Sequence, residues 1–99
     1  MKKVYILGDG GHDYTDARRF GELHFIQIPS ALKWEISGLY DHLRENLMSA
    51  EHDDYLLVSN LASHIAVATA IMVEWFGQVN LLLFRNDKYE AHTLITDRD

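Results

Sequence analysis

Short apolar runs separated by polar turns predict a sheet whose strands are buried on both faces. Residues 4–7 are an unbroken run of β-forming side chains, and residues 55–58 and 79–84 repeat this pattern. Strands of a parallel sheet that is covered on both faces have this composition, because neither face alternates between apolar and polar positions. Residues 23–28 alternate partly and end at Pro29, which predicts a further strand.

Two longer segments have helical periodicity. One apolar stripe follows Ser30, a suitable N-cap, at steps of three and four residues: Leu32, Ile36, Leu39, Leu43 and Leu47. Residues 64–76 are apolar almost all round, and Gly77 ends this second helix. A helix without a polar face is covered on two sides. We therefore expect a second copy of the chain to pack on it, giving a homodimer through residues 64–76.

The order of elements predicts the fold class. A short helical turn at residues 17–20 separates the first two strands, and the polar turn at residues 86–88 leads into an edge strand at residues 89–95. Helices between unalternating strands are crossover connections of a mainly parallel sheet, and the final hairpin adds an antiparallel edge. We predict a single α/β domain over residues 1–99, a small Rossmann-like arrangement of three layers.

Charge and composition limit the partners. Nine basic residues stand against fifteen acidic ones, a formal net charge of −6. Such a surface repels phosphate backbones, which argues against duplex nucleic acid and membrane surfaces as partners. The chain has no cysteine, so a disulfide framework and a thiolate zinc site are excluded. The longest nearly apolar stretch, residues 65–73, is shorter than the ~20 residues that span a bilayer, and no signal-peptide pattern is present; we expect a soluble cytoplasmic protein.

Ligands of open parallel sheets bind where the carboxyl ends of the strands meet, and polar residues of this chain gather there. The residues that follow the first strand are Asp9, Gly10, Gly11, His12, Asp13 and Tyr14. Those that follow the strand at residues 55–58 are Ser59, Asn60, Ser63 and His64, and Arg85 follows residues 79–84. At the opposite edge the chain has residues typical of solvated turns: Lys2, Lys3, Asp53, Asp54 and Gln78. The first edge is therefore the predicted site.

Residues 59–64 join a buried strand to a buried helix. Backbone N–H groups at a helix start lack intrahelical partners and attract anions, and the side chains of Ser59, Asn60 and Ser63 would add donors. The alternative is that Ser63 caps its own helix and Asn60 closes a turn. The glycines at positions 8, 10 and 11 do not have the full spacing of a dinucleotide fingerprint, so they predict either a tight turn or a close approach to a ligand.

The loop at residues 12–16 admits three interpretations. His12 beside carboxylates can act as a general base, with Arg18 and Arg19 available to hold a phosphate. In a second interpretation, His12, Asp13, Asp16 and His64 form a metal site, but their spacing matches no dedicated motif. In the third, the aspartates cap the short helix that follows. We predict neither a metal nor a cofactor.

The segment from Asn60 to Ala68 resembles the motif of small viral ring nucleases that act as type III anti-CRISPR proteins. In that family a small residue and Gly-His follow a central strand, and Thr-Ala follows three residues on. The resemblance places His64 on the family's general acid and Ala68 on its alanine, whereas Ser63 replaces the glycine and Val67 the threonine. It implies a dimeric α/β protein that binds a cyclic oligoadenylate across the dimer and cleaves it without metal. The missing threonine hydroxyl implies that the ligand could be bound without being cleaved.

A second resemblance, carried by residues 11–17 with Phe20 and Gly21, is to uncharacterised small proteins of phages and mobile elements. Together these features predict a homodimer that sequesters or slowly cleaves a nucleotide, such as a cyclic messenger of antiviral defence. In the cleaving version, a metal-independent phosphodiesterase, His64 protonates the leaving oxygen and His12 assists the attacking 2′-hydroxyl. Tyr14 would stack on a base. The alternative is a dimeric inhibitor of a host protein that has no small ligand.

Overall fold

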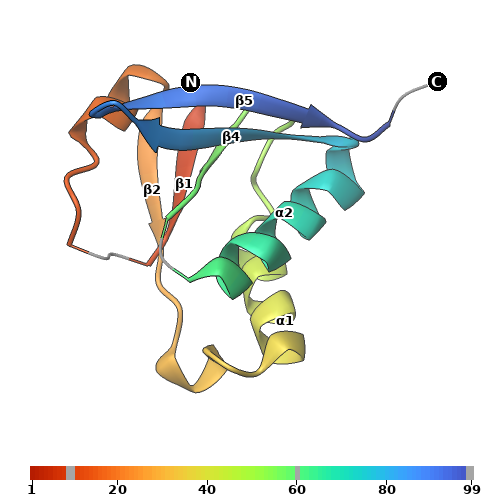
Figure 1. Ribbon diagram of the computed structural model, residues 1–99. Helices are drawn as coiled ribbons and strands as arrows, with labels where there is room; N and C mark the ends of the chain where they lie inside the picture. Colours follow the sequence, from red (N-terminus) through yellow and green to blue (C-terminus); the bar gives the residue numbers. More distant parts are fainter. Residues whose placement is uncertain (9–10, 60, 98–99) are drawn as a thin grey trace.

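The computed structural model describes residues 1–8, 11–59 and 61–97, in which one five-stranded sheet lies against two α-helices. The elements along the chain are β1 (Lys3–Leu7), the 3-10 helix η1 (Thr15–Arg19), β2 (Glu22–Ile26), the 3-10 turn η2 (Ser30–Leu32), α1 (Ile36–Asn46), β3 (Tyr55–Leu57), α2 (Ala62–Phe76), β4 (Gln78–Arg85) and β5 (Lys88–Ile95). The sheet order is β2-β1-β3-β4-β5 (Figure 1), with β5 alone antiparallel to its neighbour. The predicted α/β class, with a parallel core and an antiparallel edge, is confirmed.

The direction of the crossovers decides which face of the sheet each helix covers. From β1 the chain moves outward to β2, and from there it returns past β1 to β3 and on to β4. Right-handed crossovers in opposite directions lie on opposite faces. Accordingly α1 and α2 lie together on one side of the sheet (Figure 1). The third layer, on the opposite face, is thin: in the described residues it consists of η1 and the loop before it.

Alternation along β1 divides the core in two. Tyr5 and Leu7 pack in the cluster beneath the two α-helices. Val4 and Ile6 point the other way and pack with residues of η1 and its loop. On the helix side, Leu39, Leu43 and Leu47 of the predicted stripe are fully buried, and burial of each such side chain contributes about 1.5–3 kcal/mol.

The first α-helix begins five residues later than predicted, with its N-cap at position 35 and not at position 30. Ser30 starts only the single turn η2, and α1 begins at Ile36. The N-cap is Glu35, whose carboxylate accepts a hydrogen bond from Gly38 N at 2.5 Å. Leu32 still packs against the core, so the apolar periodicity continues across a break in the backbone hydrogen bonds. That periodicity is why the sequence pattern concealed the break.

The second α-helix begins at Ala62 and ends where Gly77 was expected to stop it. Gly77 adopts φ of +69° as C-cap, and its N–H bonds to Val73 O at 2.8 Å. A Cβ at this position would lie 2.5 Å from Asp97 Cβ. The N-cap is Leu61, so Ser63 lies inside the first turn and does not cap the helix. Among the described residues, no helix is long and apolar enough to cross a bilayer.

Asp54 departs from the predicted solvated edge, because it is buried. Its Oδ1 accepts a hydrogen bond from Lys3 N at 2.9 Å and its Oδ2 accepts one from Glu51 N at 2.8 Å. The Asn80 amide donates to the backbone carbonyls of Asp54 and His52, at 3.1 and 3.0 Å. This network holds the start of β1 and the start of β3 in register at the amino edge of the sheet.

Candidate functional site

A cavity of about 360 Å³ lies at the carboxyl edge of the sheet. Its lining residues come from the loop after β1, the end of β3 and the β4-β5 hairpin: His12, Asp13, Val58, Ser59, Phe84 and Tyr89. Crossovers leave β1 and β3 on opposite faces, so this is the topological switch point at which such sheets bind ligands. The structure thus brings residues of both loops named by the sequence into one cavity.

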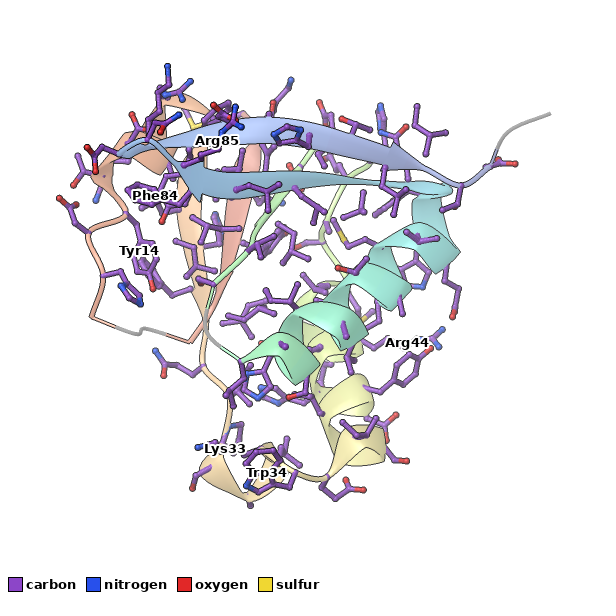
Figure 2. All side chains as sticks on the ribbon, in the orientation of Figure 1. Tyr14, Lys33, Trp34, Arg44, Phe84 and Arg85 are labelled. Atoms are coloured by element: carbon purple, nitrogen blue, oxygen red, sulfur yellow. The ribbon has the colours of Figure 1, made fainter. Side chains whose placement is uncertain are left out.

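Aromatic rings form much of the cavity wall. Phe84 is 56% exposed, and the centroid of its ring lies 5.0 Å from that of Tyr89. The His12 ring lies 6.0 Å from Tyr14, which in turn lies 5.7 Å from Phe25. Figure 2 shows Tyr14 and Phe84 on the same side of the molecule. An exposed ring beside a cavity offers a face on which a flat ligand can stack.

Asp13 makes the polar part of the cavity negative. Its Oδ1 accepts hydrogen bonds from Thr15 N at 2.9 Å and Thr15 Oγ1 at 2.5 Å. These two bonds lower the pKa of the Asp13 carboxyl below its ordinary value, so the group is ionised at neutral pH. Among its described lining residues there is no lysine or arginine. The cavity therefore favours hydroxyl and amino groups and disfavours a phosphate.

Ser59 contributes a hydroxyl that has no hydrogen-bond partner. Its Oγ is buried, and no donor or acceptor in the described part of the chain reaches it. An unpaired buried polar group costs about 1–3 kcal/mol. Because Ser59 also lines the cavity, a polar group of a bound ligand could supply the missing partner.

His64 lies apart from this cavity. It belongs to the buried stripe of α2, with Ala68, Ile71 and Met72, which packs on the helix side of the sheet. Tyr89 of the cavity belongs instead to the core on the η1 side. His64 is not among the cavity's lining residues. Of the two histidines predicted as an acid-base pair, only His12 is among the described lining residues of the cavity.

Burial gives His64 a different role, in the pH dependence of stability. Desolvation, with a smaller contribution from the Lys33 charge, lowers the pKa of the His64 imidazole below 6.5, and its Nε2 has no partner in the described residues. The unfolded chain then binds more protons than the folded one once the pH falls below about 6.5, so stability decreases on acidification.

We expect the stability of the His64→Leu variant to decrease much less on acidification than that of wild type, because leucine has no imidazole that burial must keep neutral. Urea unfolding at pH 7.5 and 5.5 measures the effect. His52→Leu is the matched control, since His52 is exposed, and it should keep the wild-type slope. Equal slopes for wild type and His64→Leu would contradict the assignment.

The remaining predicted site residues have diverse surroundings. Tyr14 is buried in the core on the η1 side, so its ring is not open for stacking. Arg85 lies outside the cavity lining and pairs with Glu90, Nε to Oε1 at 3.3 Å. Gly11 is exposed, with φ of +75°. Ser63 is half-buried in the first turn of α2. Asp9, Gly10 and Asn60 lie outside the described residues.

The aspartates of the loop hold η1 in place. Asp16 Oδ2 accepts a hydrogen bond from Tyr89 N at 2.7 Å, and the Arg19 guanidinium donates to Tyr89 O. Asp13 bonds to Thr15 at the start of η1, but the N-cap of this helix is Tyr14, without a side-chain cap bond, so the interpretation in which aspartates cap the helix is not borne out at the N-cap position. In the part of the chain that the structure describes, no three His, Asp or Glu side chains gather to hold a metal ion.

Sequence reasoning missed three residues of the cavity: Val58, Phe84 and Tyr89. Phe84 and Tyr89 are cross-strand partners. The turn between them carries positive φ at Asn86 and Asp87. An Asn-Asp pair between two β-forming runs is a signal for this tight hairpin. It could have placed both rings together at the carboxyl edge.

Comparison with known proteins identifies the family. No curated protein and no solved structure matches the chain significantly. Residues 2–95 match the family described as phage Pam3 gp32-like protein. The match supports the resemblance to small phage proteins and does not support the resemblance to anti-CRISPR ring nucleases. The chain belongs to the phage Pam3 gp32-like protein family.

Proposed function

We propose that this phage protein binds a nucleotide in the cavity at the carboxyl edge and sequesters it without cleaving it. The observation that carries the proposal is the cavity itself, in which an exposed aromatic ring, an ionised carboxylate and an unpaired hydroxyl converge at the switch point of the sheet. The Phe84 ring is suited to stack on a base. The Asp13 carboxylate and the Ser59 hydroxyl are suited to pair with ribose hydroxyls or an amino group.

A first phosphate would bind at the start of α2. Leu61, the N-cap, provides no side-chain hydrogen bond to the first turn. The N–H groups of Ala62 and Ser63 have no acceptor among the described residues, and such groups attract anions at the N-terminus of a 15-residue helix. Ser59 of the cavity lies three residues before Ala62, so base and phosphate sites are adjacent along the chain.

Sequestration fits the geometry better than cleavage. Cleavage through a 2′-hydroxyl needs an acid near the leaving oxygen and a base near the nucleophile. His12 lines the cavity, whereas His64 is buried among the helix-side core. Cyclic oligonucleotides of antiviral defence are the ligands we propose first, with the bound ligand recovered intact.

Titration with adenosine, guanosine, cytidine and uridine monophosphates, and with cyclic di-, tri- and tetra-adenylate, tests the proposal. The expected result is a raised melting temperature, with amide NMR shifts at His12, Asp13, Ser59 and Tyr89 for at least one nucleotide. Chromatography should return that nucleotide unchanged. If every nucleotide leaves the melting temperature and the amide shifts unaltered, the proposal is wrong.

A second candidate function, a homodimer that acts on a host protein without a small ligand, is favoured by a groove between α1 and α2. Its lining, which is mainly apolar but has two polar residues of α1, includes Ile36, Ser37, Tyr40 and Asp41 of α1, with Ala66, Val67 and Ala70 of α2. Ile36 is 53% exposed beside the small alanines. In a two-fold dimer the same patch of both copies meets across the axis. The exposed Ile36 side chain of one copy could then pack in the groove of the other. The occupant we propose is a second copy of the chain.

The Ala70→Glu variant is expected to be monomeric if this groove is the dimer interface, because a charge would be buried against an apolar partner. Sedimentation velocity of wild type and variant measures the change. Thr96→Glu, at an exposed position outside the groove, is the control and should sediment like wild type. A wild type that sediments as a monomer at all concentrations would exclude the dimer.

A further inference from the structure

A second hollow, which we call the basic groove, lies at the amino ends of β1 and β2, on the side of η1. Its lining includes three cations, Lys2, Arg18 and Arg19, with Phe20 and Phe25. In the described part of the chain, three basic residues thus line one groove, where Glu22 is the single acidic lining residue. A local excess of positive charge in a chain of net charge −6 attracts an anion to this place.

Two of these cations have no counter-ion in the described part of the chain. Arg18 is exposed and makes no ion pair or hydrogen bond there. Lys2 is also exposed, and its Nζ lies 5.7 Å from the centroid of the Tyr55 ring. Arg19, by contrast, shares its charge with Asp16, Nε to Oδ1 at 3.2 Å. Lys2 and Arg18 are therefore the groups that an anionic ligand would pair with first.

The basic groove and the cavity lie on the same face of the sheet, and contacts between their lining residues connect them. The Arg19 guanidinium, which lines the groove, donates a hydrogen bond to the backbone carbonyl of Tyr89, which lines the cavity. Rings connect the two hollows as well, because Tyr14 lies 6.0 Å from His12 of the cavity and 5.7 Å from Phe25 of the groove. Phe25 is 44% exposed.

The two hollows have complementary chemistry. The described lining of the cavity has an exposed ring and a carboxylate but no lysine or arginine, whereas the basic groove has cations and exposed Phe25. A ligand that carries several phosphates and several bases would satisfy both. Basic side chains beside exposed aromatic rings are the combination that binds single-stranded nucleotide chains.

We infer that the basic groove binds the phosphates of a nucleotide chain whose neighbouring base occupies the cavity. This inference rests on the proposed function and narrows it, because the ligand then has more than one nucleotide. The groove pairs with further phosphates through Lys2 and Arg18. Phe25 offers a stacking face to a second base.

Binding of adenosine 5′-monophosphate and of linear 5′-phosphorylated triadenylate, each to wild type and to the Lys2→Gln/Arg18→Gln variant, tests the inference. In wild type the trinucleotide should bind roughly tenfold more tightly than the mononucleotide at low salt. The variant should keep the mononucleotide affinity and lose this gain. Loss of two phosphate contacts on a single strand should also reduce the slope of log K against log salt by about 1.4.

The Lys33→Gln/Arg44→Gln variant is the matched control, since it removes two cations that do not line the groove. This control variant should still bind the trinucleotide more tightly than the mononucleotide, as wild type does. The basic groove plays no part if wild type binds both nucleotides with equal affinity. The same holds if the two double variants have the same ratio of trinucleotide to mononucleotide affinity. In either case the proposed function stands. If only the trinucleotide binds, and Lys2 and Arg18 carry that binding, the groove is supported and the cavity is not. Binding of neither nucleotide overturns the inference about the basic groove, and the full nucleotide titration then decides the proposed function separately.

Discussion

The Phe84→Ala variant should bind the nucleotide about 5- to 150-fold more weakly than wild type, because base stacking on an aromatic side chain contributes about 1–3 kcal/mol. Phe84 is 56% exposed and forms one wall of the cavity. Its removal therefore takes away the stacking face and leaves the core intact. Isothermal titration with the nucleotide that gives the largest melting shift measures the change in Kd.

Two further variants make this result specific. Phe84→Leu keeps apolar bulk without a ring face, so it should fall between wild type and Phe84→Ala. Trp34→Ala is the control, because Trp34 is 81% exposed and lies far from Phe84 (Figure 2). It should bind like wild type. Undiminished affinity of Phe84→Ala would show that the ligand binds elsewhere.

The Asp54→Ala variant should lose about 3 kcal/mol of unfolding free energy, because two hydrogen bonds to one carboxylate disappear together. In the folded protein Lys3 N donates to Asp54 Oδ1 at 2.9 Å and Glu51 N donates to Asp54 Oδ2 at 2.8 Å, and both donors would lose their acceptor. The site is buried, so water replaces the carboxylate poorly. In a domain of this size the loss corresponds to a fall in melting temperature of roughly 12–24 °C.

The neighbouring aspartate provides the control. Asp53 is half-buried and makes no hydrogen bond or ion pair within the described residues. Asp53→Ala should therefore change stability by less than about 0.5 kcal/mol. Asp54→Asn, which keeps one acceptor oxygen, should lose roughly half as much as Asp54→Ala. Urea unfolding of the four proteins measures these differences, and equal values for the two alanine variants would contradict the role of Asp54.

The two aspartates show what a local pattern leaves open. In the sequence both belong to one charged turn, Glu51 to Asp54, and both are typical of a solvated edge. Only the docking of the turn against the start of β1, 51 residues away along the chain, buries one and not the other. Lys2 was grouped with the same solvated edge and is exposed, and only the fold shows that it shares the lining of the basic groove with Arg18.

In the candidate site, too, the sequence identified some residues and only the tertiary structure placed the others. The carboxyl-edge rule identified His12, Asp13 and Ser59, and these residues line one cavity. It could not separate His64 from them, because helical phase and packing on the sheet decide that this side chain points into the helix-side core. It did not identify Phe84 and Tyr89 either, since their rings reach the cavity only through the hairpin register.

The sequence by itself determined the α/β class, the order of elements, the antiparallel edge and the stop of α2 at Gly77, because these depend on periodicity and on the backbone freedom of single residues. Tertiary structure alone decided which polar groups meet. That outcome depends on crossover direction, strand register and helix phase, through which residues such as Asp16 and Tyr89, 73 positions apart, come into hydrogen-bond contact. Contacts over such separations follow from the packing of whole elements, and local composition does not encode them.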